Sequence, residues 1–295
     1  TGESVVEDSK YDLLKDILKK RDPGYSPPVG AKLREGENRT ELPFWLGSLD
    51  KIKTDEKAFD KWKAKYTCSY VISEKLDGNS GLYYVNDDKN VSLYTRGDGT
   101  HGQNVTSLLP FVKGLPAIVP KTQTAVRGEF IISKSDFLKL KDKGANARNM
   151  VAGILNAKLP DIEVAKHVQF IAYEVINPVL PPEQQMEFME EVGFRTVWNK
   201  VITEKTLSLE KLSDVLVDRR TKSAYDIDRI VVMHNDSYTR EKENPKYAFA
   251  FKNVQTMDKA EVIVSKVEWN ISKDGYMRPV VIFNPVYLAG VTIQR

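Results

Sequence analysis

Strand-like and helix-like runs follow one another in this chain without a regular alternation of one strand and one helix. Three short β-rich runs lie at 69–73, 80–85 and 91–95, and the polar stretch 86–90 joins the last two. A short polar connection between two such runs is typical of a β-hairpin. The pattern therefore predicts an α+β fold with antiparallel sheets rather than a doubly wound parallel sheet.

The remaining elements are predicted from apolar spacing, capping residues and β-branched runs. Helices are expected at 8–20, from a cap at Thr54 through Tyr66, and at 134–143, 148–157, 182–191 and 209–221. Further strands are expected at 124–132, 168–176, 228–233, 247–251, 262–269 and 279–287. Gly193 follows the helix at 182–191 and is expected to close it.

The composition excludes several classes of protein. The single cysteine, Cys68, allows no intrachain disulfide and favours a reducing compartment. One cysteine and three histidines that are scattered along the sequence cannot form a structural zinc site of the usual Cys₄, Cys₃His or Cys₂His₂ kind. No apolar run approaches the roughly 20 residues of a membrane-spanning helix. The net charge of +3 means that any nucleic-acid surface must come from local clustering of basic residues. The chain starts without methionine and ends inside a strand-like run, which predicts a processed or truncated piece.

The most informative short motif is Lys-x-Asp-Gly at 75–78, in a turn between two expected strands. A lysine becomes a nucleophile when burial or neighbouring cations favour its neutral form. A charged surface turn is the competing interpretation, because this pattern arises by chance in roughly one chain of this size in ten to twenty. Lys75 is therefore a candidate nucleophile that needs support from other motifs.

Two further motifs are suited to an anionic ligand. Arg96 begins the stretch Arg-Gly-Asp-Gly-Thr-His-Gly, in which glycines let the backbone approach a phosphate and the guanidinium can contact phosphate or ribose oxygens. The tip of a β-hairpin would explain the same glycines. Glu129 lies in the run Val-Arg-Gly-Glu-Phe, where a buried charge indicates a ligand or metal contact, or else an ion pair on an edge strand.

Two later strand-like runs carry charge at one end. The first is Asp-Ile-Asp-Arg-Ile-Val-Val at 226–232, and the second is Tyr-Ala-Phe-Ala-Phe-Lys at 247–252. A lysine that extends its ammonium to the surface would explain Lys252 without any ligand.

In this order, the five motifs resemble those of the covalent nucleotidyltransferases and, among them, of the NAD⁺-dependent DNA ligases. The resemblance covers nearly the whole chain. Other matching segments are Leu-Gly-Ser-Leu-Asp at 46–50, Asn-Ala-Arg-Asn at 146–149 with Ala152 and Gly153, Ser-Lys-Asp-Gly at 272–275, and 279–290, which is similar to the first strands of the family's OB domain. Asp8, Tyr11 and Asp12 match the family's segment for the nicotinamide mononucleotide (NMN) half of NAD⁺, although an amphipathic helix with a polar start would have the same residues.

The resemblance implies a fold and a division into domains. The fold is the α+β covalent nucleotidyltransferase fold, which is similar to ATP-grasp, with antiparallel sheets, a small N-terminal helical cap and the beginning of an OB-fold β-barrel. The expected parts are a truncated NMN-binding helical segment at 1–40, the nucleotidyltransferase (adenylation) domain at 41–254 and an incomplete OB domain at 255–295.

The resemblance also implies an activity. Lys75 would attack NAD⁺ to form lysyl-AMP and release NMN, and the AMP would pass to a 5′-phosphate at a DNA nick for sealing. The implied cofactors are NAD⁺ and Mg²⁺ or Mn²⁺, with no fixed protein ligands for the metal but with Glu129 and Asp228 near it. The expected partner is nicked double-stranded DNA, with no membrane. We expect a monomer inside the cell, in the cytoplasm, the nucleoid or a viral replication site.

The family's roles carry over to matching positions of this chain. Residues expected at the cofactor are Asp8, Tyr11, Asp12, Ser48, Leu49, Glu74, Asp77, Arg96, Glu129, Tyr173 and Lys252. Residues expected to face DNA or phosphate are Asp98, Arg148 and Asn149. Tyr173 is the candidate for stacking on adenine, with an ordinary core tyrosine as the alternative. Lys252 is expected to neutralise the α-phosphate.

Several positions depart from the family pattern. Ser73 and Gln103 stand where the family has acids, Asn156 where it has arginine, Met233 where it has lysine, and Arg229 where it has glycine. A charge-assisted contact of the kind lost at Met233 is worth about 1.5–3 kcal/mol. Arg229, Lys242 or Lys246 are the candidates to replace it.

Two other functions remain as alternatives at this point. One is an ATP-dependent ligase or RNA-capping relative, and the other is a non-catalytic module that binds nucleotide or DNA on the same fold. The intact residues Lys75, Asp77, Arg96, Glu129 and Lys252 favour the enzyme. Met233 and Gln103 favour the binding module.

Overall fold

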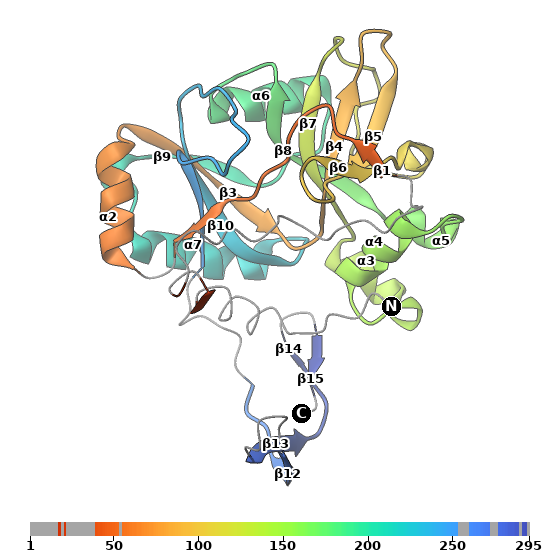
Figure 1. Cartoon of the computed structure of the whole chain (residues 1–295), viewed down its shortest axis with the longest axis vertical. Helices are drawn as coiled ribbons and strands as arrows, with labels where there is room; N and C mark the ends of the chain where they lie inside the picture. Colours follow the sequence, from red (N-terminus) through yellow and green to blue (C-terminus); the bar gives the residue numbers. More distant parts are fainter. Residues whose placement is uncertain are drawn as a thin grey trace.

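The computed structural model describes residues 17–18, 21, 39–52, 55–252, 260–271, 277–288 and 291–293. Most of the helix expected at 8–20, and with it Asp8, Tyr11 and Asp12, lies outside these residues. The matching segment at 272–275 lies outside them as well. Two larger sheets form the body of the described part (Figure 1).

The first of these sheets has four antiparallel strands in the order β5-β4-β7-β8. Its strands are β4 (Asn79–Val85), β5 (Val91–Thr95), β7 (Ala125–Ile131) and β8 (Gln169–Asn177). The predicted hairpin joins β4 to β5, with Gly81 opposite Thr95. Phe130 of β7 and Phe170 of β8 are opposite each other and fully buried, with ring centroids 5.2 Å apart. This aromatic pair lies in the main hydrophobic core.

The second sheet has five strands in the order β2-β11-β10-β3-β9. Its strands are β2 (Asp50–Ile52), β3 (Ser69–Leu76), β9 (Asn199–Thr203), β10 (Ile227–His234) and β11 (Ala248–Phe251). Every pair is antiparallel except β11 with β2, which is parallel. The predicted α+β fold with antiparallel sheets is therefore confirmed, and this one parallel pair is the exception.

Helices α2 (Glu56–Lys65) and α7 (Leu209–Lys222) pack against one face of the second sheet (Figure 1). From α2, the rings of Phe59 and Trp62 lie 6.3 Å and 4.7 Å from the ring of Phe249 on β11. From α7, Arg219 forms an ion pair with Glu74 on β3. Successive residues of a strand point to opposite faces, so every second residue of β3 packs under the helices and the others face the opposite side.

The remaining helices lie around the two sheets, whereas β12 to β15 lie apart from them at the bottom of the view (Figure 1). Four further helices are α3 (Lys134–Lys139), α4 (Ala147–Asn156), α5 (Ile162–Ala165) and α6 (Pro182–Val192). Short 3-10 helices are η1 (Thr106–Leu108), η2 (Lys141–Lys143) and η3 (Glu204–Thr206). The remaining strands are β1 (Arg39–Glu41), β6 (His101–Gln103), β12 (Val264–Ile271), β13 (Met277–Phe283), β14 (Val286–Leu288) and β15 (Val291–Ile293).

Most predicted elements are present with shifted boundaries. The helix expected at 134–143 ends at Lys139, and η2 follows it. The helix expected to begin with a cap at Thr54 is capped by Asp55, whose carboxylate accepts the Ala58 N–H at 3.1 Å. Gly193 closes α6 with a φ of +99°, as predicted. The short strands β1, β2, β6 and β9 have no counterpart in the sequence prediction, because three to five residues carry little periodicity.

The described C-terminal strands form two separate hairpins. β12 pairs with β13 and β14 pairs with β15, both antiparallel. Among the residues that the structure describes here, these strands close no barrel, so the start of an OB barrel stays a prediction. No helix within the described ranges is long and apolar enough to span a bilayer.

Substitution of two glycines by alanine should change the stability of the chain in opposite directions. A Cβ on Gly81 would lie 2.2 Å from the ring of buried Phe130, so we expect Gly81→Ala to lower the free energy of unfolding by about 1–3 kcal/mol. A Cβ on Gly153, inside α4, meets no atom within 4 Å. Gly153→Ala should therefore raise the free energy of unfolding by about 0.5–1 kcal/mol. Urea denaturation of both variants checks the pair, and equal effects would contradict the packing around β4.

Candidate active site

Lys75 is the next-to-last residue of β3 and points away from the two covering helices. It is opposite Arg229 of β10 in the antiparallel register, and Glu74 is opposite Ile230. Glu74 and Ile230 are buried on the helix side, so Lys75 and Arg229 share the other face. Lys75 is partly exposed there, and its charge acts on Glu129 of the first sheet. Lys75 therefore faces the space between the two sheets.

Glu74 lies on the opposite face from Lys75. Its carboxylate pairs with Arg219 Nε at 2.7 Å and accepts a hydrogen bond from the Ser223 hydroxyl at 3.1 Å. The Arg219 guanidinium in turn lies over the Trp198 ring, 4.8 Å from its centroid. Glu74 is only 5% exposed, and both carboxylate oxygens have partners within the protein. We therefore leave Glu74 out of the groups that can hold a ligand at Lys75.

Small and apolar side chains cover much of the sheet on the Lys75 side. Ser73 of β3 is opposite Val231 of β10, and Met233 of β10 is opposite Ala248 of β11. Met233 is buried, and it lies four residues along β10 from Arg229. Position 233 thus contributes an apolar surface to this face.

Glu129 is the acidic group of the site. It lies in β7 opposite Ser80, and burial raises its pKa to about 7, against the opposing effect of the positive charges of Lys75, Arg127, Arg148 and Arg96. No hydrogen bond or ion pair joins its carboxylate to another residue in the described part of the chain. A carboxylate surrounded by cations but bonded to none of them is available as a hydrogen-bond acceptor for a ligand.

Arg96 and Arg127 bring positive charge to the same region. Arg96 Nη1 donates to the Ser48 hydroxyl at 3.3 Å, and burial together with the charge of Arg127 lowers the pKa of Arg96. Arg127 is 9% exposed and donates to the Gly47 carbonyl at 2.7 Å. Sequence reasoning does not single out Arg127. The alternation of β7 could have identified it, because Arg127 is two residues from Glu129 and therefore on the same face.

Tyr173 of β8 supports Arg127. Its hydroxyl lies 2.7 Å from the Ser80 hydroxyl, which also accepts a hydrogen bond from Arg127 Nε at 3.2 Å. The Arg127 guanidinium lies 5.6 Å from the centroid of the Tyr173 ring, and burial raises the pKa of Tyr173 to about 12. Both the hydroxyl and the ring of Tyr173 therefore have protein partners.

Asp77 and Arg148 are brought together, although the sequence assigns them to different roles. Arg148 lies in the first turn of α4, and its Nη1 contacts Asp77 Oδ1 at 2.7 Å. The Arg148 carbonyl accepts a hydrogen bond from Asn79 at 3.1 Å. The neighbouring Asn149 is exposed, and its N–H donates to the helix cap Asn146 at 2.7 Å. The side chains of Asp77, Arg148 and Asn149 thus form the exposed rim of the site.

Asp98 organises the glycine-rich turn. One carboxylate oxygen accepts the N–H groups of Thr100 at 2.9 Å and His101 at 2.7 Å. Although partial burial opposes the effect, these hydrogen bonds lower the pKa of Asp98. Gly97 and Gly99 have φ values of +53° and +94°, which few other residues adopt. The glycines after Arg96 therefore form a tight turn, which is the alternative explanation that the sequence allows for them.

The predicted contacts Ser48 and Leu49 precede the edge strand β2, and Lys252 follows β11, the strand next to it. The Ser48 N–H donates to Asn244 Oδ1 at 3.1 Å, and Leu49 beside it is partly buried. Lys252 directly follows β11, and its N–H donates to the Ile52 carbonyl at 3.3 Å. Each of these segments is thus held by a neighbouring strand or loop.

The described residues contain no group of three or more His, Cys, Asp or Glu side chains spaced to hold a metal ion. Asp228 has one carboxylate oxygen, Oδ2, 3.2 Å from Arg229 Nη2. Its other oxygen, Oδ1, is buried and has no hydrogen-bond partner. An unpaired buried oxygen of this kind fits a single contact to a cation, but not a complete protein-built cage.

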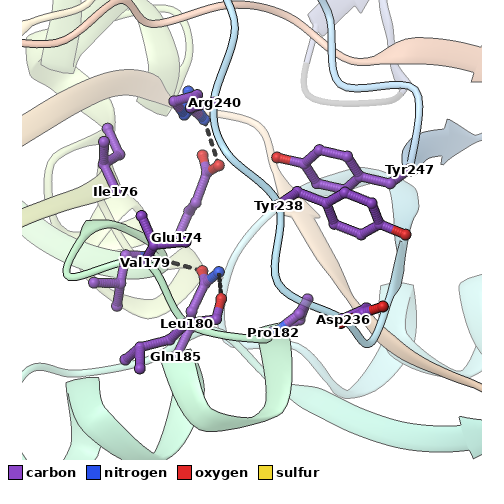
Figure 2. Close-up of a pocket in the computed structure, with 11 residues that line it drawn as sticks. Glu174, Ile176, Val179, Leu180, Pro182, Gln185, Asp236, Tyr238, Arg240 and Tyr247 are labelled. Atoms are coloured by element: carbon purple, nitrogen blue, oxygen red, sulfur yellow. Dashed lines mark hydrogen bonds and ion pairs between the residues drawn. The ribbon is translucent and has the colours of Figure 1, made fainter.

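A small pocket beside the site is too small for a cofactor (Figure 2). Its cavity of about 20 Å³ has room for roughly one water molecule. At its upper edge Arg240, from the loop after β10, forms an ion pair with Glu174 of β8, and Tyr238 stacks on Tyr247 at 4.0 Å. Glu174 also lies 3.5 Å from Arg127. The pocket therefore belongs to a polar network that joins the two sheets.

The sequence of the chain is similar to those of known DNA ligases. The family described as NAD-dependent DNA ligase adenylation domain matches residues 46–255. A DNA ligase of Acanthamoeba polyphaga mimivirus is 41% identical over 303 residues, covering 100% of this chain and 46% of that protein. A putative DNA ligase of Invertebrate iridescent virus 6 is 33% identical, with 100% and 48% covered, and a DNA ligase of Wolbachia pipientis is 29% identical, with 98% and 47% covered. The chain thus spans about half the length of these relatives.

Glu129 makes the stability of the chain depend on pH. The pKa of Glu129 is about 7 in the folded protein against an ordinary value of 4.5, so the folded state binds the proton more tightly and stability falls as pH rises through this window. At pH 8 we expect the free energy of unfolding of Glu129→Gln to be about 1–3 kcal/mol higher than that of the parent. Below pH 4.5 this difference should disappear. Denaturant titrations at the two pH values measure it. The exposed Glu191→Gln is the control, and equal stability of Glu129→Gln and the parent at pH 8 would contradict the raised pKa of Glu129.

The Glu74–Arg219 pair should be essential for stability. Arg219→Met leaves a buried carboxylate without its cation, so we expect the free energy of unfolding to fall by about 3–5 kcal/mol. The double variant Glu74→Leu with Arg219→Met should recover most of this loss, because no charge is then buried. Lys211→Met, at an exposed position of α7, should change little. A double variant as unstable as Arg219→Met would show that the pair is not the cause.

Proposed function

Because this chain belongs to the NAD-dependent DNA ligase family through the family's adenylation domain, we propose that Lys75 is the residue that receives AMP from NAD⁺. The observation that carries the proposal is the position of Lys75 between the two sheets, facing Glu129 and the arginines that act on it. The pyrophosphate of NAD⁺ is an anion, and a partly buried group of cations is the surface that binds it best.

The first step is a phosphoryl-type transfer to nitrogen. The neutral Nζ of Lys75 attacks the α-phosphorus of NAD⁺ and a P–N bond forms, while the P–O bond to the phosphate of NMN breaks and NMN leaves. The attacking amine loses a proton to solvent. Positioning and neutralisation of the phosphate charge are the main contributions of a protein to such a transfer.

The AMP then moves to DNA. An oxygen of the 5′-phosphate at a nick attacks the same phosphorus, the P–N bond breaks and Lys75 takes back a proton. The 3′-hydroxyl next loses its proton to solvent and its oxygen attacks the 5′-phosphorus. The phosphodiester forms, the P–O bond between the 5′-phosphorus and AMP breaks, and AMP leaves. Nicked double-stranded DNA is therefore the proposed macromolecular substrate.

Individual residues suit different parts of the dinucleotide. Arg96, held by Ser48, is suited to a phosphate or ribose oxygen, and Glu129 can accept hydrogen bonds from ribose hydroxyls. Lys252 is suited to the α-phosphate. Tyr173 is better explained as support for Arg127 than as an adenine stack, since its ring and hydroxyl have protein partners. The NMN contacts Asp8, Tyr11 and Asp12 stay predictions.

A divalent cation, Mg²⁺ or Mn²⁺, would supply charge neutralisation at the phosphates. Asp228 offers a buried oxygen without a hydrogen bond, and Glu129 offers a carboxylate without a protein partner. Mg²⁺ usually binds through one or two carboxylates together with phosphate oxygens and water, which agrees with a site that lacks a protein-built cage. The two carboxylates are therefore the proposed metal contacts.

The DNA-facing surface that we propose is the exposed rim formed by Arg148 and Asn149. Their positions at the start of α4 put a guanidinium and an amide near the helix N-terminus, where phosphates bind well. Asp98 is better explained by its role in the turn. The monomeric state and the intracellular setting also stay predictions.

Covalent labelling tests the proposed function. We expect the chain, incubated with NAD⁺ and Mg²⁺, to gain the mass of one AMP, and Lys75→Ala to gain none. The exposed Lys200→Ala, on the neighbouring strand β9, should label like the parent. Intact-mass spectrometry and peptide mapping give the readout. Labelling by ATP but not by NAD⁺ would instead support the ATP-dependent alternative, and no labelling by either would support the non-catalytic binding module.

A further inference from the structure

Three cationic residues lie in one row across neighbouring strands of the second sheet. Lys75 of β3 is directly opposite Arg229 of β10. On the other side of β10, the last pair of the register is Ile230 with Phe251 of β11. Lys252 directly follows β11, and continuing the antiparallel register by one residue would place it beside Arg229. Arg229 is the middle member of the row, and its side chain is only 13% exposed.

The positive charges of this row repel one another. Directly opposite residues of an antiparallel pair have their Cβ atoms about 4.5–5.5 Å apart, and like charges at that spacing destabilise a sheet. Asp228 Oδ2 lies 3.2 Å from Arg229 Nη2 and compensates part of the charge. Lys75 and Lys252 remain on either side of Arg229. An anion placed over the row would relieve the repulsion and contact all three cations.

We propose that Arg229 is a catalytic residue that contacts the phosphate transferred to Lys75, as the central cation of the row Lys75–Arg229–Lys252. This proposal rests on the proposed function, since it assigns the phosphate to the NAD⁺ whose AMP Lys75 receives. A guanidinium is planar and can offer two parallel N–H groups to phosphate oxygens. From the middle of the row, Arg229 neutralises the oxygens of the α-phosphate while the Lys75 nitrogen bonds to the phosphorus.

The other cations considered for this role are less well placed. Lys246 Nζ lies 3.5 Å from Asp50 and 3.9 Å from Glu243, and its side chain is 54% exposed. Lys242 is exposed on the loop after β10. On β10 itself, Val231 and Met233 are the next side chains on the Lys75 face, and neither is charged.

Arg229 is an additional cation rather than a substitute placed at position 233. Four residues of a strand span about 13 Å, so Met233 lies far along β10 from the pair that Arg229 forms with Lys75. A lysine introduced at position 233 would extend from a different part of the sheet. A lysine at position 233 is therefore a control for Arg229 on the same strand and the same face of the sheet.

The experiment compares Arg229→Lys, Arg229→Met and the double variant Arg229→Met with Met233→Lys. We expect single-turnover formation of Lys75–AMP from NAD⁺ to slow by about ten- to a hundred-fold in Arg229→Met and by less than about ten-fold in Arg229→Lys. The double variant should stay as slow as Arg229→Met. Labelling by Arg229→Met at the parent rate would overturn the proposal, and so would full rescue by Met233→Lys.

A second measurement needs no chemistry. Inorganic pyrophosphate should raise the thermal unfolding midpoint of the parent chain by binding to the row, and this increase should be smaller in Arg229→Met. An equal increase in both would overturn the proposal. If the parent binds pyrophosphate through Arg229 but is never labelled by NAD⁺, the proposed transfer of AMP to Lys75 is contradicted, whereas anion binding by Arg229 is supported. If the parent is labelled and Arg229→Met behaves like it, the proposed function stands and the role of Arg229 fails.

Discussion

The ion pair between Glu74 and Arg219 holds β3 against α7 and thereby sets the direction in which Lys75 points. Neighbouring residues of a strand point to opposite faces, so a carboxylate anchored under the helix forces the next side chain into the space between the sheets. Ser223 and the Trp198 ring complete this anchor. The proposed nucleophile is therefore positioned by a residue that lies on the opposite face of the sheet.

A second buried carboxylate, Glu174, connects the two sheets beside that space. Arg127 approaches it from β7 of the first sheet, and Arg240 from the loop after β10 of the second. Although burial opposes it, the two guanidinium groups lower the pKa of Glu174, so the carboxylate is held in its charged form. Arg127 is thereby fixed with its other nitrogens on Gly47 and Ser80. The distance between the facing walls of the site thus depends on a polar network behind them.

Local patterns predict the elements and several members of the site, because hairpins, caps and apolar spacing act over a few residues. The β4–β5 hairpin and the closure of α6 by Gly193 are examples. The register between two strands depends on residues far apart in the sequence. Local patterns therefore do not predict which side chains of neighbouring strands lie opposite each other. The pairing of Arg229 with Lys75 follows a register shift between Ile227 and Arg229, which no pattern within β10 reveals.

Ser73 and Met233, which stand where the family pattern has an acid and a lysine, can be explained together. Ser73 is opposite Val231, so Met233, two residues further along β10, is its diagonal neighbour on the same face. Diagonal positions lie about 7–8 Å apart, within reach of long side chains, and an acid and a lysine there can balance each other. Replacement of both leaves this part of the sheet neutral, whereas loss of either alone would leave an unbalanced partly buried charge. The positive charge of this face instead lies around Arg229, directly opposite Lys75, the proposed acceptor of AMP.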